Sequence, residues 1–331
     1  MVTSQRQPTL YIGNGPEISW YRVDVDAAEV AKQGSLRLDG NVGYAWPHPS
    51  RQFLYVASSQ RGETSGEARI NALRIDPATG ALSVHGAPAP LPAGPVHINV
   101  DRDGTHIYAA YTRLPTVTVC RINADGTLGA EMPQPQDLDV GVFGHQVRVM
   151  PSGRSVIVVA RGYDPKDTRP EVPGALKLFA TTDGVLSNRG SIAPNGGFGF
   201  GVRHLDCHPT QPWFYVSVER HNELVMFPIG PGDAVPPEPT YRKNTLSRVR
   251  PAGVLQGSGP IHMHPNGRTV YVTNRSDGEG EDNIAVFSID QATGEPTLIQ
   301  HAEHQSRHVA TFQIDPSRSE EHTSELQSRG L

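Results

Sequence analysis

The sequence of residues 201–227, GVRHLDCHPTQPWFYVSVERHNELVMF, decides the fold of this chain. In chain order it predicts a strand, a tight turn at His208-Pro209-Thr210-Gln211, a second strand rich in aromatic and β-branched residues, a polar loop and a third strand. Consecutive antiparallel strands joined in this way form a β-meander.

The same pattern occurs five more times along the chain. Measured between the centres of the apolar runs, the 260 residues from Tyr11 to Tyr271 divide into five steps that average 52 residues. Repeats of roughly 40–50 residues with about four strands each are typical of propeller blades. We therefore expect an all-β chain, a β-propeller with six recognisable units and the start of a seventh. The other five central runs are residues 10–12, 53–56, 106–109, 155–158 and 269–272.

Composition agrees with many short strands and excludes several classes of partner. The chain has 331 residues, 34 Gly and 29 Pro, and it contains no apolar run long enough to cross a membrane. Its formal net charge is −5 and its basic residues are scattered, so we expect no nucleic-acid partner. The N-terminal residues lack the apolar core of a signal peptide, which predicts a cytoplasmic protein. In that reducing compartment Cys120 and Cys207 are expected to be structural thiols.

The two ends of the repeat pattern are irregular. The first unit, residues 9–36, has no inner strand of its own, and an inner-strand signal appears at residues 307–314. Residues 318–328 have almost no apolar character and resemble the in-frame translation of a widely used sequencing adapter. We therefore expect a propeller domain over residues 1–317 with an incomplete last blade, and a disordered, non-native tail over residues 318–331. Unpaired backbone beside the gap predicts poor stability.

Two stretches inside the repeats also depart from the strand pattern. Residues 162–173 are polar and rich in proline, and we expect them to form a loop over one face of the ring. Residues 230–248 are expected to pack along the outside or to order in part as an outer strand.

The repeat itself predicts which side chains meet. The inner strand of each blade starts at the face where the second strand ends, because the two strands are antiparallel neighbours. Positions six residues before a turn proline hold His145 and Arg203, and positions four residues after a central run's midpoint hold Arg161, Glu219 and Arg275. Cationic groups beside a carboxylate and an imidazole at one mouth of the channel favour a small anionic substrate.

These residues lie in motifs that resemble a known family, the seven-bladed lactonases that include bacterial 6-phosphogluconolactonases and carboxy-cis,cis-muconate cyclases. The resemblance extends to about Ser317 and implies that His145, Arg203, Glu219 and Arg275 are the catalytic set. Val202 stands where the family usually has proline, and Ala310 stands where many members have arginine, which puts the full set of anion contacts in doubt. The matching segments are GHQVRVMPSGR (144–154), GVRHLDCHP (201–209), YVSVE (215–219) and YVTNRSDGEGEDNIAVF (271–287).

Structural roles compete with these functional ones. His145 alone could be a packed histidine, and the arginines could be hydrogen-bonding groups between blades with Glu219 as their counter-ion. His204 follows Arg203 on the strand and is expected to face the other way. The grouping of His208, His262 and His264 follows the strand period and the repeated His-Pro turn, so we predict no metal and no cofactor.

Three functions remain open at this level. The first is a lactone hydrolase, with 6-phosphogluconolactone as the leading substrate, in which Glu219 or neutral His145 activates water while Arg203 and Arg275 hold the phosphate or the developing oxyanion. The second is a cycloisomerase of the carboxymuconate type, in which the arginines bind carboxylates and His145 or Glu219 moves the proton. The third is a non-catalytic propeller that binds a metabolite or a protein.

Overall fold

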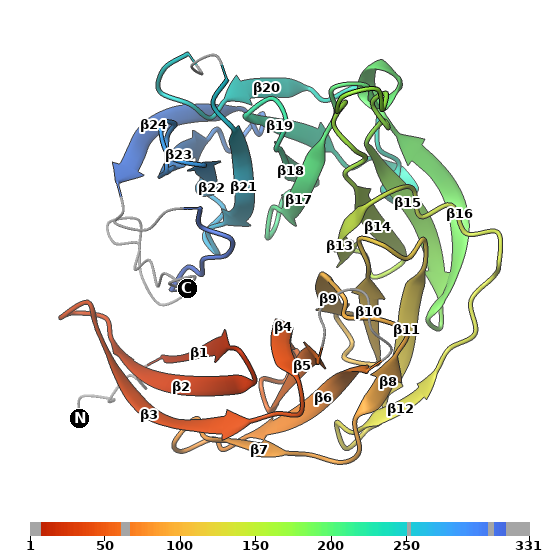
Figure 1. The fold of residues 1–331 in the computed structure, drawn as a ribbon, viewed down its shortest axis with the longest axis vertical. Helices are drawn as coiled ribbons and strands as arrows, with labels where there is room; N and C mark the ends of the chain where they lie inside the picture. Colours follow the sequence, from red (N-terminus) through yellow and green to blue (C-terminus); the bar gives the residue numbers. More distant parts are fainter. Residues whose placement is uncertain (1–7, 61–66, 250–252, 304–307, 316–331) are drawn as a thin grey trace. The chain divides into compact units, whose positions relative to one another are not determined.

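The computed structural model describes residues 8–60, 67–249, 253–303 and 308–315. Apart from two short 3-10 segments, η2 (Pro194–Gly197) and η3 (Pro231–Asp233), its regular structure is entirely β. The strands form antiparallel sheets whose members are consecutive in the chain (Figure 1). The chain divides into two compact units, Met1–Pro135 with Asp183–Val185, and Gln136–Thr182 with Leu186–Leu331.

The first unit holds three sheets. The N-terminal sheet has three strands, as expected for a unit without an inner strand of its own. It consists of β1 (Thr9–Asn14), β2 (Glu17–Asp24) and β3 (Glu29–Arg37). The next consists of β4 (Asn41–Pro47), β5 (Phe53–Ser59), β6 (Ala68–Ile75), β7 (Leu82–Val84) and β8 (Ala89–Leu91). The third consists of β9 (His97–Val100), β10 (His106–Ala110), β11 (Val117–Ile122) and β12 (Leu128–Glu131).

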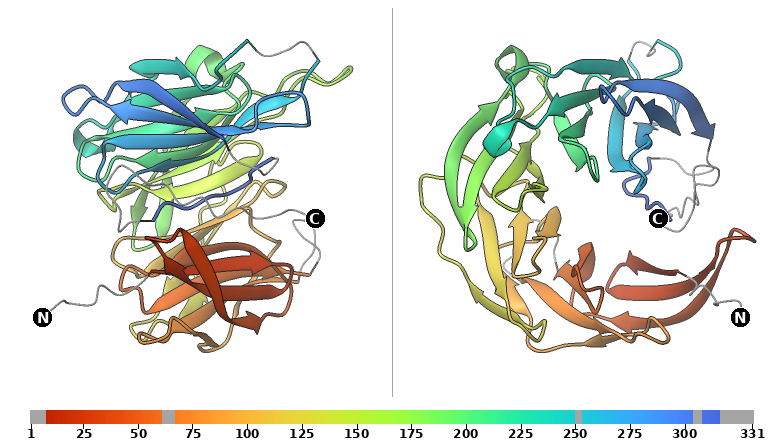
Figure 2. Two further views of the ribbon diagram at one scale, coloured as in Figure 1. Left: turned by 90° about the vertical axis from the view of Figure 1, so that its left-hand side faces the viewer. Right: turned by 180° about the vertical axis from the view of Figure 1, so that it is seen from behind.

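The second unit holds three four-stranded sheets. Figure 2 shows from two further sides that the strands of each sheet lie next to one another and that each sheet is twisted. The first consists of β13 (Gly144–Val149), β14 (Ser155–Ala160), β15 (Ala175–Thr182) and β16 (Val185–Ile192). The second consists of β17 (Val202–Cys207), β18 (Trp213–Val218), β19 (Glu223–Pro228) and β20 (Tyr241–Asn244). The third consists of β21 (Gln256–Met263), β22 (Thr269–Ser276), β23 (Asn283–Ile289) and β24 (Pro296–Glu303).

The predicted all-β class and the blade-like repeat are confirmed. Every predicted central run lies in a strand, and in the five sheets that possess an inner strand that run is the second strand, as in β14, β18 and β22. The irregular stretch at residues 230–248 does contribute an outer strand, β20. Cys120, which is buried, and Cys207, which is partly exposed, are not joined in a disulfide.

The inner strand predicted at residues 307–314 is wrong for the part that the structure describes. Residues 308–314 have no strand assignment, because they form no ladder with any described strand. Val309 and Phe312 are nevertheless buried, and they pack against Tyr271, Ile284 and Val286 of the last sheet. The apolar residues of this segment are therefore buried, although the segment is not paired in a sheet. The predicted tail at residues 318–331 lies outside the described residues.

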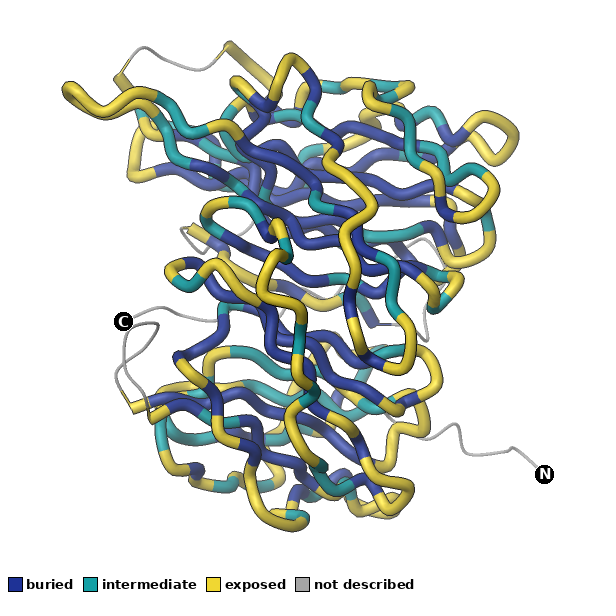
Figure 3. Tube along the Cα trace, turned by 90° about the vertical axis from the view of Figure 1, so that its right-hand side faces the viewer, coloured by how far each residue is buried: buried dark blue, intermediate teal, exposed yellow. Residues whose placement is uncertain are grey.

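The central strands are buried on both faces because neighbouring sheets within a unit pack face to face. On β18, Phe214 and Val216 belong to a core shared with β14, whereas Trp213 and Tyr215 belong to a core shared with β22. This double burial explains why the central runs are apolar throughout, without the alternation of a strand that faces water on one side. Buried residues accordingly concentrate in the strands, and the turns are exposed (Figure 3).

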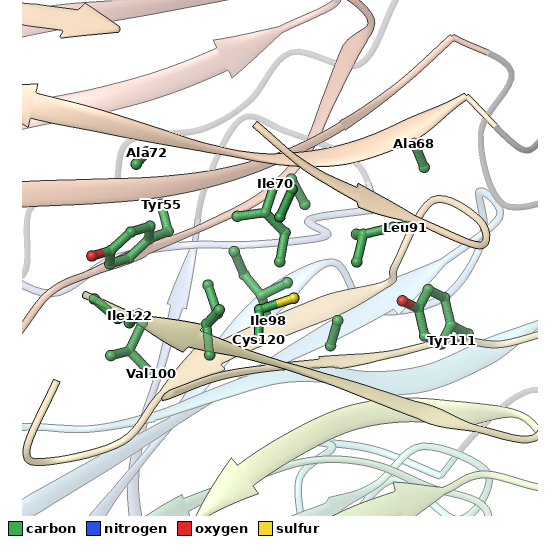
Figure 4. Packing of buried hydrophobic residues seen from close by; sticks show 14 of the residues in the cluster. Tyr55, Ala68, Ile70, Ala72, Leu91, Ile98, Val100, Tyr111, Cys120 and Ile122 are labelled. Carbon is green, nitrogen blue, oxygen red and sulfur yellow. The ribbon is translucent and has the colours of Figure 1, made fainter. Parts of the chain in front are cut away.

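The first unit is built in the same way. One core joins the sheet of β4–β8 to that of β9–β12, and Figure 4 shows Tyr55 and Ile70 from the former facing Ile98 and Cys120 from the latter. Because residues from two sheets fill one layer, no single blade can bury its apolar faces alone.

A repeated hydrogen bond fixes each blade to the next. A tyrosine hydroxyl in a central run donates to the carbonyl oxygen of a glycine in the outer turn of the following sheet, over 2.8 Å from Tyr11 to Gly80, 2.9 Å from Tyr55 to Gly126 and 2.8 Å from Tyr215 to Gly294. These glycines have positive φ, between 74° and 85°, a conformation that favours glycine. Each of these glycines therefore both permits its turn and accepts the hydrogen bond that joins its sheet to the preceding one.

Replacing Tyr215 by phenylalanine tests this contact. Tyr215 is fully buried, so the variant leaves the Gly294 carbonyl without its donor and should lower the free energy of unfolding by about 1–3 kcal/mol. Chemical denaturation measures the change, and Tyr241→Phe, at a partly exposed position, is the matched control. Equal stability of the two variants contradicts the docking role.

Candidate active site

The carboxylate of Glu219 lies at the centre of the predicted cluster. Oε2 accepts hydrogen bonds from Arg161 Nε at 3.2 Å and from Arg203 Nη1 at 3.3 Å, and Oε1 accepts one from Arg275 Nη2 at 3.1 Å. The three guanidinium groups come from three consecutive sheets of the second unit, after β14, on β17 and on β22. The side chains are largely buried, with exposed fractions of 18% for Glu219 and 6% for Arg275.

The fourth predicted residue, His145, lies on β13 and is buried. Its ring packs edge-on against that of His204, with the ring centroids 4.9 Å apart. Its Nδ1 atom is buried and has no hydrogen-bond partner within the described residues. The ring of His204 thus contacts His145 of the neighbouring sheet, and its direction relative to Arg203 stays a prediction.

Two of these side chains occupy the same special position in their strands. His145 is the extra residue of a β-bulge, since its neighbours Gly144 and Gln146 pair with Ala160 and Val159 on β14. Arg203 is the extra residue of the equivalent bulge between β17 and β18. A bulge interrupts the alternation of side chains and turns the added residue out of the pleat. The bulges thus direct an imidazole and a guanidinium group out of the regular ladder.

Electrostatics set the protonation of the imidazole and the carboxylate. Burial, together with the charges of Arg203, Arg275 and Arg161, holds the pKa of His145 well below its usual value, so the ring is neutral at neutral pH. Burial opposes ionisation of Glu219, but the three guanidinium groups outweigh it and lower the pKa of the carboxyl. A neutral imidazole therefore lies near an ionised carboxylate.

The arginines differ in what remains available for a ligand. Burial and the neighbouring Arg275 lower the pKa of Arg203 to about 10, so its guanidinium remains charged at neutral pH. The Nε atoms of Arg203 and Arg275 are buried and have no hydrogen-bond partner among the residues that the structure describes. A buried donor without a partner is costly to the folded protein.

Two glycines allow the charged side chains to approach so closely. A Cβ atom added at Gly257 would lie 2.9 Å from Glu219 Cγ, and one added at Gly259 would lie 2.3 Å from Thr273 Oγ1 and 2.8 Å from Arg275 Nε. Neither glycine has positive φ, so their requirement comes from space and not from backbone conformation. The sequence did not identify these two glycines as part of the site, because the candidates were chosen among side chains that ionise.

Two further polar residues join the cluster from outside the repeat. Asp164, in the loop at residues 162–173, accepts from Arg161 Nη2 at 2.8 Å, and His308 Nε2 lies 3.4 Å from Arg275 Nη1. Both belong to irregular segments, so the repeat spacing that found the other residues carried no signal for them.

Of the three histidines considered as metal ligands, His208 and His264 bind turn backbone, whereas His262 lies on β21 with its Nδ1 3.8 Å from Asp206 Oδ2. His208 Nδ1 accepts from the backbone N–H of Gln211 at 2.9 Å, and Nε2 lies 2.9 Å from the carbonyl oxygen of Gly267. His264 Nδ1 accepts from the N–H of Asn266 at 3.2 Å. Among the described residues, no group of three or more His, Cys, Asp or Glu side chains is arranged to hold a metal ion.

Comparison with known proteins identifies the family. The family model described as "Lactonase, 7-bladed beta-propeller" matches residues 2–319. This chain belongs to that family. The cluster around Glu219 thus lies in a lactonase fold, as the motifs in residues 144–287 implied.

Individual relatives agree. The chain is 24% identical to the 6-phosphogluconolactonase of Bacillus subtilis over 92% of this chain and 83% of that protein, and 29% identical to the 6-phosphogluconolactonase of an Enterobacter species over 73% and 65%. The solved structure of a Pseudomonas aeruginosa periplasmic gluconolactonase is similar in fold, with a TM-score of 0.68, 20% identity and coverage of 93% and 86%. The family and these relatives favour the lactone hydrolase over the cycloisomerase and the binding protein.

The close contact at Gly259 generates a prediction. Gly259→Ala should displace Arg275 and lower kcat/KM for the lactone at least about tenfold, because small misplacements of reacting groups are costly. Gly43→Ala is the matched control, since Gly43 lies in the corresponding bulge between β4 and β5 and an added Cβ would have no neighbour closer than 3.6 Å. Lactone hydrolysis assays compare the two, and equal activity contradicts the packing argument.

Proposed function

We propose that this protein hydrolyses a sugar lactone, with 6-phosphogluconolactone as the leading substrate, at the cluster formed by His145, Arg203, Glu219 and Arg275. The observation that carries the proposal is the arrangement of Glu219. Its carboxylate accepts hydrogen bonds from three guanidinium groups, whose combined charge exceeds its own, and burial together with the same three arginines keeps the imidazole of His145 neutral.

Arg203 and Arg275 would bind the anionic parts of the reaction. Guanidinium groups present several N–H donors in a fixed geometry that suits phosphate, carboxylate and oxyanion oxygens. The Arg203 side chain is 14% exposed and has Glu219 as its one hydrogen-bond partner among the described residues, so other donors of its guanidinium group remain for an anion. The same groups would stabilise the oxyanion that forms when water adds to the lactone carbonyl.

His145 is the better candidate for the general base. Three cations lower the pKa of Glu219 and reduce its tendency to take a proton. The ring of His145 is already neutral, because burial and the neighbouring arginines lower its pKa, and an anion bound at Arg203 and Arg275 would offset the part of this effect that comes from their charges. His145 would take a proton from water as the water oxygen bonds to the carbonyl carbon, and would return it to the ring oxygen when the ester C–O bond breaks.

The relatives support the substrate class. Those named above act, by their names, on 6-phosphogluconolactone or gluconolactone.

No described helix is long and apolar enough to cross a membrane. The predicted cytoplasmic location stays a prediction, since one relative is named as periplasmic.

Turnover of a small panel tests the proposal. The panel holds 6-phosphogluconolactone, unphosphorylated gluconolactone and carboxymuconate. Hydrolysis of the phosphorylated lactone above the spontaneous rate is expected, and hydrolysis of only the unphosphorylated lactone would overturn the phosphate assignment. Conversion of carboxymuconate alone would select the cycloisomerase, and inactivity on all three would select a binding protein.

Substitutions should separate binding from chemistry. Arg203→Ala should mainly raise KM, because a ground-state contact with the anion is lost. Glu219→Gln and His145→Ala should lower kcat by roughly 10²–10⁴. The matched control is Glu223→Gln, which removes a carboxylate whose Arg242 partner is exposed. Full activity in both the Glu219 and His145 variants would refute the assigned mechanism.

The protonation of His145 can be measured directly. Because burial and the neighbouring arginines lower the pKa of His145, its ring should become protonated only well below pH 6.5. Nitrogen NMR of the histidine rings follows the titration, and the His145→Ala variant assigns the signal. A midpoint at or above pH 6.5 contradicts the electrostatic argument.

A further inference from the structure

Arg161 is bound to the protein in a way that Arg203 and Arg275 are not. Its Nε donates to Glu219 at 3.2 Å, its Nη2 donates to Asp164 at 2.8 Å, and its Nη1 lies 3.5 Å from the carbonyl oxygen of Gly162. Each guanidinium nitrogen therefore has an acceptor of the protein's own. An arginine held in this way has fewer donors left for a substrate than Arg203, whose one hydrogen bond among the described residues is to Glu219.

Asp164 is fixed in turn by a second arginine. Arg220, the residue after Glu219, donates from Nε to Asp164 and from Nη1 to Glu171. Glu171 also accepts from the backbone N–H of Gly199 at 2.6 Å. Carboxylates near both ends of the loop at residues 162–173 are thus tied to one arginine, and backbone bridges between Tyr163 and Val172 close its base.

Both edges of the Arg161 guanidinium group donate hydrogen bonds to carboxylates, which explains why an arginine suits this position better than a lysine. A planar fork can reach two carboxylates at once, whereas a lysine ammonium has neither this span nor this fixed geometry. The guanidinium carbon also lies 5.9 Å from the centre of the Phe143 ring, and the Arg161 backbone N–H donates to the Phe143 carbonyl oxygen at 2.9 Å. Phe143 has a φ of 59°, a conformation that non-glycine residues seldom adopt.

We propose that Arg161 is a positioning residue of the lactonase site, one that orients the Glu219 carboxylate while the loop at residues 162–173 fixes Arg161 through Asp164. This inference rests on the proposed function for its catalytic consequence. In this arrangement Arg203 and Arg275 serve the substrate, and Arg161 holds the carboxylate that keeps those two like charges together. The loop is a structural part of the site.

Two substitutions at Arg161 test the role by activity. Arg161→Gln should lower kcat by about 10- to 100-fold with KM changed less than about threefold, because the carboxylate is no longer held in place. Arg161→Lys keeps the charge but not the fork, so it should lose part of kcat only. Arg242→Gln is the matched control, since this exposed arginine also lies between two carboxylates, Glu223 and Glu238. A rise in KM with kcat unchanged would make Arg161 a substrate-binding residue and overturn the proposal.

A pH measurement gives a readout that does not depend on turnover. The charged groups that face Glu219 are Arg161, Arg203 and Arg275, with neutral His145 nearby. Removing one cation should raise the midpoint of Glu219 ionisation by about one pH unit in Arg161→Gln, while Arg161→Lys and Arg242→Gln leave it nearly unchanged. Carbon NMR of the glutamate carboxylates follows the midpoint, and Glu219→Gln assigns the signal.

The two measurements distinguish failure of this inference from failure of the proposed function. If the unmodified protein hydrolyses no lactone but the Glu219 midpoint shifts as expected, the function is wrong and the contact of Arg161 with Glu219 stands. If the lactone is hydrolysed and Arg161→Gln changes neither kcat nor the midpoint, the positioning role is refuted.

Discussion

The site depends on one carboxylate shared by three guanidinium groups. Arg161, Arg203 and Arg275 come from three successive sheets, and without Glu219 their like charges would repel one another in a largely buried place. Burying a charge without a partner costs far more than an exposed ion pair contributes. Glu219 therefore stabilises the local fold, and the three guanidinium groups carry two more positive charges than its single carboxylate offsets.

The position of Glu219 follows from the strand that precedes it. β18 is apolar because it lies between two packed sheets, and its ladder with β17 ends at Val218. The next two residues, Glu219 and Arg220, are the first that the packing leaves free to be charged. They serve different partners, since Glu219 binds the site arginines and Arg220 binds the acids of the loop at residues 162–173. The buried part of the strand therefore ends at Val218, and the charged groups begin at the next residue, Glu219.

The sequence was informative wherever the repeat was regular. Counting from turn prolines and central runs predicted that His145, Arg203, Glu219 and Arg275 would lie close together. Residues at the same distance along equivalent strands lie at the same end of their sheets, because each residue adds the same length to a strand. This counting could not show that His145 and Arg203 lie in bulges, since these are backbone features. Nor did it show the spatial need for Gly257 and Gly259, or the part of Asp164, which lies in a loop without periodicity. At residues 308–314 apolar spacing predicted a strand, but pairing needs a neighbour that spacing does not reveal.

The bulges at His145 and Arg203 have a consequence for how such a site can change over time. A residue added within a bulge has no partner directly opposite it in the ladder, so its side chain is not one of a cross-strand pair. Exchange of that side chain therefore leaves the pairing register of the sheet unchanged. Gly43 occupies the same place in the first unit and has no side chain at all. The reactive side chains and the strand pairing therefore depend on different residues. A repeat protein built in this way can acquire or lose a reactive group in one blade while the strand pairing of that blade stays the same.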